Sequence, residues 1–185
     1  MTQIGILALQ GAFTEHARAL QALGVTTTFV RTATALTDLD GLVLPGGEST
    51  TMRKLLTREN LLAPLRQLIH QGLPTFGTCA GLVLLSQPDA LNGLTGDVVR
   101  NGFGRQRESF ETELTLQGLA QPFPAVFIRA PYLKTVGPDA TILAQIDNRI
   151  VAAQQANVLV TAFHPELTAD TQLHAYFLKH LVTKG

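Results

Sequence analysis

The chain contains a single cysteine, Cys79, in a setting that favours chemistry over packing. It lies in the segment Gly-Thr-Cys-Ala-Gly, residues 77–81, with a glycine two positions to either side. A nucleophile on a sharp turn between a strand and a helix needs small neighbours at these two offsets. Such a turn exposes the side chain, and the positive end of the following helix favours a thiolate. Free cysteines are most often buried core residues, but this context predicts that Cys79 is a nucleophile.

Backbone groups near Cys79 are candidates for an oxyanion hole. The N–H group of Ala80 would point to the position where an oxyanion forms during acyl transfer. The segment Pro-Gly-Gly-Glu-Ser, residues 45–49, follows a strand-like run and could present consecutive N–H donors to a ligand. By itself this segment is typical of an ordinary turn. Beside the cysteine loop, it is predicted to supply the second half of the oxyanion hole.

A base for the thiol is predicted at His164. This histidine follows the strand-like run at 157–163, and Glu166 stands two residues further on, so both side chains would point the same way in an extended segment. A thiol needs a base, and the base needs a group that fixes its tautomer and stabilises its charged form. Cys79, His164 and Glu166 are therefore predicted to form a catalytic triad.

The remaining histidines and the rest of the sequence suggest no further site. Three histidines in helical patterns are expected at the surface or partly buried, and a fourth is expected to pack on the last helix: His16, His70, His174 and, as the packing residue, His180. The sequence has no cysteine pair, no His-x-x-x-His and no carboxylate cluster at ligand spacing, so we predict no metal site. No Gly-x-Gly-x-x-Gly follows the first strand, so we expect no dinucleotide and no other cofactor.

Short apolar strands alternate with amphipathic helices along the chain and must position these residues. Strands are predicted at 4–9, 25–30, 40–47, 74–78, 113–116, 125–130, 141–146, 149–155 and 157–163, the last three including a hairpin that turns at Asp147 and Asn148. Helices are predicted at 13–24 with Thr14 as its cap, at 56–72, from residue 80 onward, and at 168–182 with Thr168 or Asp170 as its cap.

The order of these elements predicts an α/β fold of three layers, with a mostly parallel central sheet and helices on both faces. One domain is expected to span residues 1–185, since no linker, repeat or low-complexity segment divides the chain. Ligands of such sheets bind outside the carboxyl ends of the strands. Three loops fall there, at 10–13, 45–50 and 77–81, and they contain the candidate residues.

Composition excludes several classes of partner. Fourteen basic residues balance fourteen acidic ones, so no basic excess suggests a nucleic-acid groove or an anionic membrane surface. The apolar runs are far shorter than the roughly 20 residues of a membrane helix, and the N-terminus does not resemble a signal peptide. A single cysteine cannot form an internal disulfide, which suits the reducing cytoplasm, where we expect the protein to be.

Together, the cysteine turn, the Pro-Gly-Gly-Glu-Ser-Thr loop and the His-x-Glu pair resemble the class I (triad) glutamine amidotransferases, which have a flavodoxin-like fold. Six segments are similar, in order and at family spacing, to the branch formed by the glutaminase subunits of pyridoxal 5′-phosphate synthase: LALQGAFTEH, LPGGESTTM, FGTCAGL, VVRNGFGRQRESFE, PFPAVFIRAP and FHPELTADTQLHAYF. They cover nearly the whole chain. The second and the fourth are specific to that branch, whereas Gly-x-Cys-x-Gly alone is not.

The resemblance implies a reaction and a set of site residues. Cys79 would attack the side-chain amide of L-glutamine, and hydrolysis of a thioester would release glutamate and ammonia. Gly46, Gly47 and Glu48 are implied to line the glutamine and oxyanion site. Arg100 would face the amino-acid end of the substrate, and Ile128 and Arg129 would form another wall of the pocket. Gln10 would contribute to the assembly of the oxyanion hole.

The resemblance also implies a partner, the lyase subunit of pyridoxal 5′-phosphate synthase. That subunit would accept the ammonia within a large hetero-oligomer, and glutaminase activity would be low until it docks. Two alternatives stay open. The chain could be another cysteine hydrolase on a similar scaffold, although the branch-specific segments argue against it. It could also be a former glutaminase kept as a binding module, but such a module would have lost a triad residue, and all three are present.

Overall fold

The computed structural model describes residues 1–183, and at Gln106 the backbone only. Its centre is a sheet in the order β2-β1-β3-β4-β11-β10-β8-β5, with β9 paired to β10. The first five of these strands run parallel, and the others extend the sheet antiparallel. The bounds are β1 Gln3–Leu7, β2 Thr26–Val30, β3 Gly41–Leu44, β4 Thr75–Thr78, β5 Gly96–Val99, β8 Tyr132–Val136, β9 Ala140–Ile146, β10 Arg149–Gln155 and β11 Val158–Thr161.

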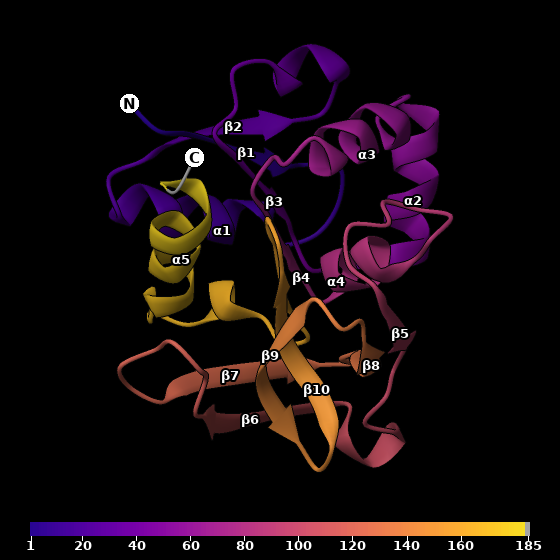
Figure 1. The fold of residues 1–185 in the computed structure, drawn as a ribbon, viewed down its shortest axis with the longest axis vertical. Coiled ribbons are helices and arrows are strands. Elements are labelled where there is room, and N and C mark those ends of the chain that lie inside the picture. The colour runs from indigo at the N-terminus through magenta and orange to yellow at the C-terminus, as the bar shows by residue number, and fades with distance from the viewer. Residues whose placement is uncertain (184–185) are drawn as a thin grey trace.

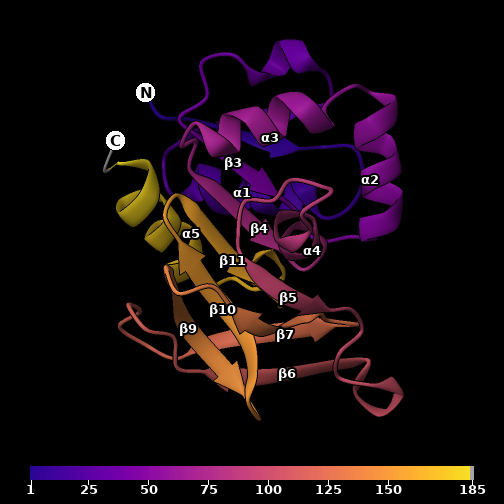
Figure 2. The same ribbon diagram turned by 45° about the vertical axis from the view of Figure 1, so that its right-hand side comes forward.

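Helices cover both faces of the parallel part, as predicted for a three-layer α/β fold. Figures 1 and 2 show α1 and α5 on one side of the sheet and α2, α3 and α4 on the other. The helices are α1 Phe13–Ala22, α2 Ser49–Arg58, α3 Leu62–His70, α4 Ala80–Ser86 and α5 Gln172–Phe177, with short turns η1 Ala33–Leu36, η2 Arg105–Arg107, η3 Pro165–Leu167 and η4 Leu178–Val182. No helix in this described part of the chain is long and apolar enough to cross a membrane.

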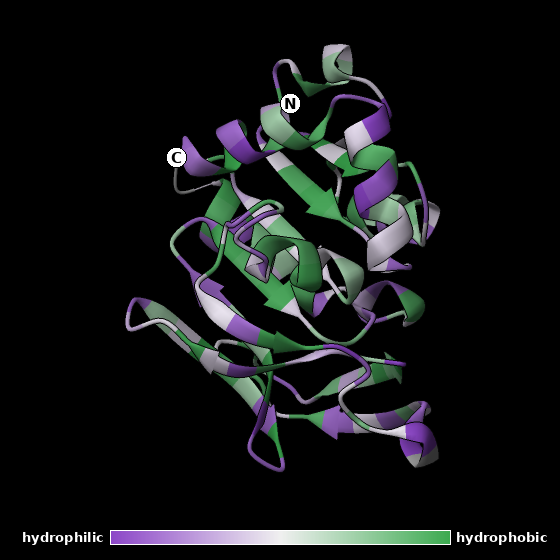
Figure 3. Cartoon of the chain, turned by 90° about the vertical axis from the view of Figure 1, so that its right-hand side faces the viewer, coloured by the Kyte–Doolittle hydropathy of each residue, from purple (hydrophilic) through white to green (hydrophobic). Residues whose placement is uncertain are grey.

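The apolar runs of the sequence become the middle of the sheet. Strands β3, β4 and β11 are buried at every position, as expected where helices cover both faces of a parallel sheet. Figure 3 shows hydrophobic residues concentrated along these central strands and hydrophilic ones on the outer helix surfaces. Adjacent strands β3, β4 and β11 end at the same edge, so Gly46, Cys79 and His164 follow them at neighbouring points.

The prediction of one helix over 56–72 was wrong. Two helices cover this part of the chain, and α2 begins at Ser49, within the predicted loop. It begins early because the Glu48 carboxylate accepts hydrogen bonds from the backbone N–H groups of Thr50 and Thr51. Asn60 adopts a left-handed backbone with φ of 55° and separates α2 from α3.

The predicted caps were only partly right. Thr14 does not cap α1, which begins one residue earlier without a side-chain cap; the N–H group of Ala12 donates instead to the carbonyl of Gly46. The last helix begins at Gln172 and not at residue 168, because residues 165–167 form a separate turn. Asp170 accepts a hydrogen bond from the backbone N–H group of Gln172.

The second half of the chain is richer in strands than predicted. The hairpin of β9 and β10 turns at Asp147 and Asn148, both with positive φ, as predicted. Strands β5 and β8 were missed because their residues are mostly half-buried or exposed and form no continuous apolar run. Strands β6 Ser109–Leu114 and β7 Phe123–Ile128 start earlier than predicted and form a separate two-stranded sheet, at the bottom of Figure 1.

Candidate active site

Cys79 occupies a strained turn between β4 and α4. Its φ of 49° and ψ of −100° lie outside the regions that L-residues prefer, a conformation that costs on the order of 1–3 kcal/mol. The backbone N–H group of Cys79 donates to the carbonyl of Thr161 at 2.8 Å, which ties the turn to the neighbouring strand β11. The sheet therefore holds the thiol in place at the edge where strands β3, β4 and β11 end.

The two glycines around this turn are sterically required. A Cβ atom on Gly81 would lie 2.3 Å from the carbonyl oxygen of Leu44, and one on Gly77 would lie 2.9 Å from the carbonyl carbon of Gly81. The backbone of α4 thus approaches β3 and β4 too closely for any side chain. This close approach is the physical basis of the Gly-x-Cys-x-Gly spacing.

His164 and Glu166 form a buried hydrogen-bonded pair after β11. The imidazole Nδ1 of His164 lies 2.7 Å from Oε1 of Glu166, and the backbone N–H group of His164 donates to the carbonyl of Val126 at 2.8 Å. Burial opposes the charged imidazole, but the hydrogen bonds and charges of Cys79 and Glu166 outweigh it and raise the pKa of His164 to about 10. His164 is therefore an imidazolium at neutral pH, beside the thiol.

Burial by itself would raise the pKa of Glu166, but the electrostatic interaction with His16, together with the hydrogen bond and the charge of His164, lowers it overall. The carboxylate is thus ionised although the residue is only 6 % exposed. The ionised Glu166 accepts the Nδ1 proton of His164, so the Nε2 side of the ring faces Cys79.

A cavity of about 290 Å³ opens in front of Cys79 and His164. The structure brings almost all predicted site residues to its wall: Gln10, Gly47, Glu48, Cys79, Ala80, Arg100, Ile128, Arg129 and His164. Two predicted residues lie behind it. Glu166 lies behind the imidazole of His164. Gly46 packs against the same imidazole so closely that a Cβ atom added to Gly46 would lie 2.2 Å from Cε1 of His164.

Glu48 and Arg100 form a charged rim. Hydrogen bonds from Thr51, through its side chain and its backbone, and from the backbone of Thr50 lower the pKa of Glu48 to about 2. Arg100 Nη2 lies 3.3 Å from the Glu48 carboxylate and 3.1 Å from the Thr50 hydroxyl oxygen. The pair presents both charges at the mouth of the cavity, which matches the α-amino and α-carboxylate groups of an amino acid.

Gln10 and Ile128 shape the other walls. The amide oxygen of Gln10 accepts a hydrogen bond from the backbone N–H group of Glu48 at 2.9 Å, so this side chain braces the glycine loop. Ile128 is 36 % exposed at the end of β7 and offers an apolar surface to the cavity. Arg129, with φ of 41°, lines the cavity from the next position.

Sequence reasoning missed several lining residues: Ser49, Val83, Asn101 and Pro131. Ser49 and Asn101 adjoin predicted residues and could have been found by extending those segments, whereas no pattern marks Val83 or Pro131. Within residues 1–183, no group of three or more histidine, cysteine, aspartate or glutamate side chains could hold a metal ion.

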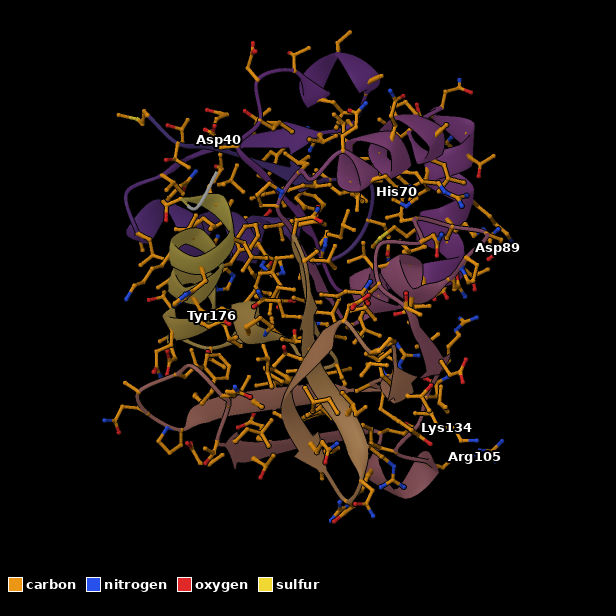
Figure 4. All side chains as sticks on the ribbon, in the orientation of Figure 1. Asp40, His70, Asp89, Arg105, Lys134 and Tyr176 are labelled. Carbon is orange, nitrogen blue, oxygen red and sulfur yellow. The ribbon has the colours of Figure 1, made fainter. Side chains whose placement is uncertain are left out.

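The expectation that His16 and His174 are surface or partly buried residues was wrong, because both are fully buried. His16 lies one turn before Leu20, on the face of α1 that packs on the sheet. The other two histidines follow the prediction. His70 is exposed on α3 (Figure 4), and His180 packs against the ring of Tyr176 with 4.4 Å between centroids.

Comparison with known proteins gives this geometry a family context. A "Pyridoxal 5′-phosphate synthase subunit PdxT" from Listeria innocua is 53 % identical over 188 residues, covering 98 % of this chain and 100 % of that protein. The protein of the same name from Desulforamulus reducens is 52 % identical, covering 95 % and 97 %. A solved structure described as a glutamine amidotransferase superimposes with a TM-score of 0.89 at 42 % identity, covering 95 % and 97 %.

More distant structures share the fold alone. A chain of the PurLQS structure from Thermotoga maritima is 15 % identical with a TM-score of 0.72, covering 97 % of this chain and 99 % of that one. Residues 6–183 match the sequence pattern of the SNO glutamine amidotransferase family. The match spans the cysteine turn, the glycine loop and the His-x-Glu pair, so the chain belongs to the SNO glutamine amidotransferase family.

Proposed function

We propose that this chain hydrolyses L-glutamine to L-glutamate and ammonia and supplies the ammonia to the synthase (lyase) subunit of pyridoxal 5′-phosphate synthase. The observation that carries the proposal is the Cys79 turn beside the His164–Glu166 pair, in one cavity. Membership of the glutamine amidotransferase family and the names of the PdxT relatives support the substrate and the destination of the ammonia.

The first half of the reaction forms a thioester. The Cys79 thiolate attacks the side-chain amide carbon of glutamine, and the carbonyl oxygen becomes an oxyanion. The backbone N–H groups of Ala80 and the Gly47 loop, braced by Gln10, are the donors proposed to stabilise it. The His164 imidazolium then donates its proton to the amide nitrogen, the carbon–nitrogen bond breaks, and ammonia leaves.

The second half regenerates the site. Neutral His164 takes a proton from a water molecule, and the resulting hydroxide attacks the γ-glutamyl thioester. The tetrahedral intermediate collapses and expels the Cys79 thiolate, so the ion pair with protonated His164 is restored. The new carboxylic acid loses its proton to solvent and leaves as glutamate. Glu166 stays ionised throughout and stabilises the imidazolium of His164.

The amino-acid end of the substrate has matching partners at the rim. In this proposal the guanidinium of Arg100 faces the α-carboxylate and Glu48 faces the α-amino group. Ile128 contacts the aliphatic carbons, and Arg129 completes the wall. Because Gly46 has no side chain, the His164 ring can occupy its position without a steric clash.

Residues 1–185 would form one glutaminase domain, which acts in the cytoplasm within a complex of two subunit types. Ammonia is useful for synthesis only if it is kept from solvent and from protonation, which favours transfer within a docked complex.

The test measures glutamate release from glutamine by the chain alone and with the synthase subunit added. We expect strong stimulation by the synthase and complete loss of turnover in Cys79→Ala, with the same melting temperature and the same binding to the partner. Turnover that survives in Cys79→Ala would exclude the nucleophile assignment. A folded wild-type protein without activity in either condition would point to another cysteine hydrolase.

A further inference from the structure

Two buried histidines that take no part in the proposed reaction lie directly behind the triad. His16 on α1 and His174 on α5 are both fully buried, although they are 158 positions apart in sequence. Nδ1 of His16 is 2.9 Å from Nε2 of His174. Nε2 of His16 lies 3.4 Å from Oε2 of Glu166 and 3.2 Å from the hydroxyl oxygen of Thr78, the residue before the nucleophile.

The surroundings of this pair are apolar. The ring of Phe76 makes edge contacts with both histidines, at centroid distances of 6.2 and 5.8 Å, and also packs against Phe177. Burial lowers the pKa of His16 and lowers that of His174 to about 3. Burial is the largest influence on His16, and the charge of His164 acts in the same direction, so together they outweigh the opposing charges of Glu166 and Glu15. Both imidazoles are therefore neutral at neutral pH.

The hydrogen-bonding needs of the buried atoms select one arrangement of protons. Within the described part of the chain, Nδ1 of His174 has no hydrogen-bond partner. Buried N–H groups without a partner are rarer in proteins than buried acceptors without one, so we assign the proton of His174 to Nε2, where it donates to Nδ1 of His16. His16 then carries its proton on Nε2, which faces Glu166 and Thr78. The opposite arrangement would aim a lone pair of His16 at a carboxylate.

The second oxygen of Glu166 needs such a donor. Oε1 accepts from His164, but Oε2 is buried and has no partner of normal hydrogen-bond length among the described residues. Nε2 of His16 lies 3.4 Å from Oε2, slightly beyond the ordinary length of a hydrogen bond. Small movements of the carboxylate toward His16 would complete the bond.

We propose that His16, oriented by His174, is a positioning residue of the glutaminase site, which donates its Nε2 proton to Glu166 and thereby fixes the carboxylate that holds His164. This inference rests on the proposed triad. The relay runs from α5 through α1 to the turn after β11, so two helices far apart in sequence contribute to the geometry of the base. The His16 side chain is never in contact with substrate and exchanges no proton with it.

Two substitutions of His16 separate this role from simple packing. His16→Leu fills a similar volume without a donor, whereas His16→Gln keeps an N–H donor near the position of Nε2. With the synthase subunit present, we expect His16→Leu to lower kcat for glutamine about 10-fold with KM within about twofold. We expect His16→Gln to recover kcat to within about threefold of the wild type. A packing role would not favour glutamine over leucine at an apolar site.

A second readout does not depend on glutamine turnover. The rate of Cys79 alkylation by iodoacetamide in the free chain, measured from pH 5 to 10, reports how His164 supports the thiolate. We expect the pH profile of His16→Leu to differ from the wild type and that of His16→Gln to match it. Melting temperatures establish that each variant is folded. If His16→Leu does not fold, His174→Leu and His174→Gln are compared in the same way, with the same order of rates expected.

The outcomes are separable from those of the proposed function. Wild-type kcat in a folded His16→Leu variant, or equal losses in the leucine and glutamine variants with an unchanged alkylation profile, would overturn the positioning role while leaving the glutaminase intact. A wild-type protein without glutaminase activity would instead refute the proposed function, and the alkylation profiles would still decide whether His16 acts on the triad.

Discussion

The substitution Gly46→Ala tests the proposed base by displacing it with a single methyl group. An added Cβ would lie 2.2 Å from Cε1 and 2.6 Å from Nδ1 of His164. The ring must retreat by about 1.2 Å before the closer pair reaches ordinary van der Waals contact at 3.4 Å. The hydrogen bond to Glu166, now 2.7 Å, cannot keep its geometry through such a shift.

A displacement of about 1 Å in a catalytic group can lower the rate about 100-fold. We therefore expect Gly46→Ala to lower kcat for glutamine about 100-fold in the presence of the synthase subunit. The overpacking should also reduce the free energy of unfolding by about 1–3 kcal/mol. Glutamate release and thermal unfolding, measured on the same preparation, give the two quantities.

Gly93→Ala is the matched control. Its Cβ would meet side-chain atoms of Leu85 at 2.9 Å and of Ile69 at 3.0 Å, away from the cavity, so the variant should lose stability while its kcat stays near the wild-type value. A folded Gly46→Ala protein with wild-type kcat would refute the reasoning, because His164 would then not be the base or would not stand where its packing requires. Equal losses of activity in both variants would trace the effect to stability alone.

Three further perturbations probe the rim and the turn. Arg100→Ala should raise KM for glutamine about 10-fold in steady-state kinetics with kcat little changed, because the guanidinium of Arg100 faces the part of the substrate that does not react. An unchanged KM would show that Arg100 does not bind the substrate. Glu48→Ala should lower the free energy of unfolding by about 1 kcal/mol at pH 7 through loss of the α2 cap. The pKa of Glu48 is lowered from 4.5 to about 2, so the stability that its carboxylate contributes is fully present above pH 4.5 and is lost as the pH falls through 2. The difference in melting temperature between Glu48→Ala and the wild type should therefore narrow over that range. A difference that stays constant with pH would contradict the role of Glu48 as a cap. Gly81→Ala should prevent the protein from folding, as judged by circular dichroism, because the added Cβ would lie 2.3 Å from the backbone oxygen of Leu44. A folded variant with wild-type stability would show that a side chain can be accommodated at this position.

The parts of the site that the sequence could predict are those whose requirements are local. The Cys79 turn needs glycines two residues away because α4 approaches β3 within van der Waals contact, and that need leaves a pattern five residues long. His164 and Glu166 are two residues apart, so one turn of chain brings them together. The alternation of apolar strands and amphipathic helices likewise predicted the parallel sheet, since covered strands must be apolar at every position.

Other features had no local signature. The break between α2 and α3 depends on one residue, Asn60, in a left-handed conformation. The residues of strands β5 and β8 are mostly half-buried or exposed, and their hydrophobicity follows no strand or helix periodicity. His16 and His174 fall in helical patterns and histidine is a residue of intermediate burial, so the sequence predicted them at the surface or partly buried.

The sequence alone was enough to predict the Cys79 turn, the pairing of His164 with Glu166 and the order of the layers that position them. The contact of Arg100 with Glu48 at the rim and the two buried histidines behind Glu166 became visible only in the folded chain. Constraints within a few residues restrict which amino acids can occur there and so leave a pattern in the sequence. A contact between residues 158 positions apart leaves no such pattern, because it exists only once the sheet has packed α1 and α5 together.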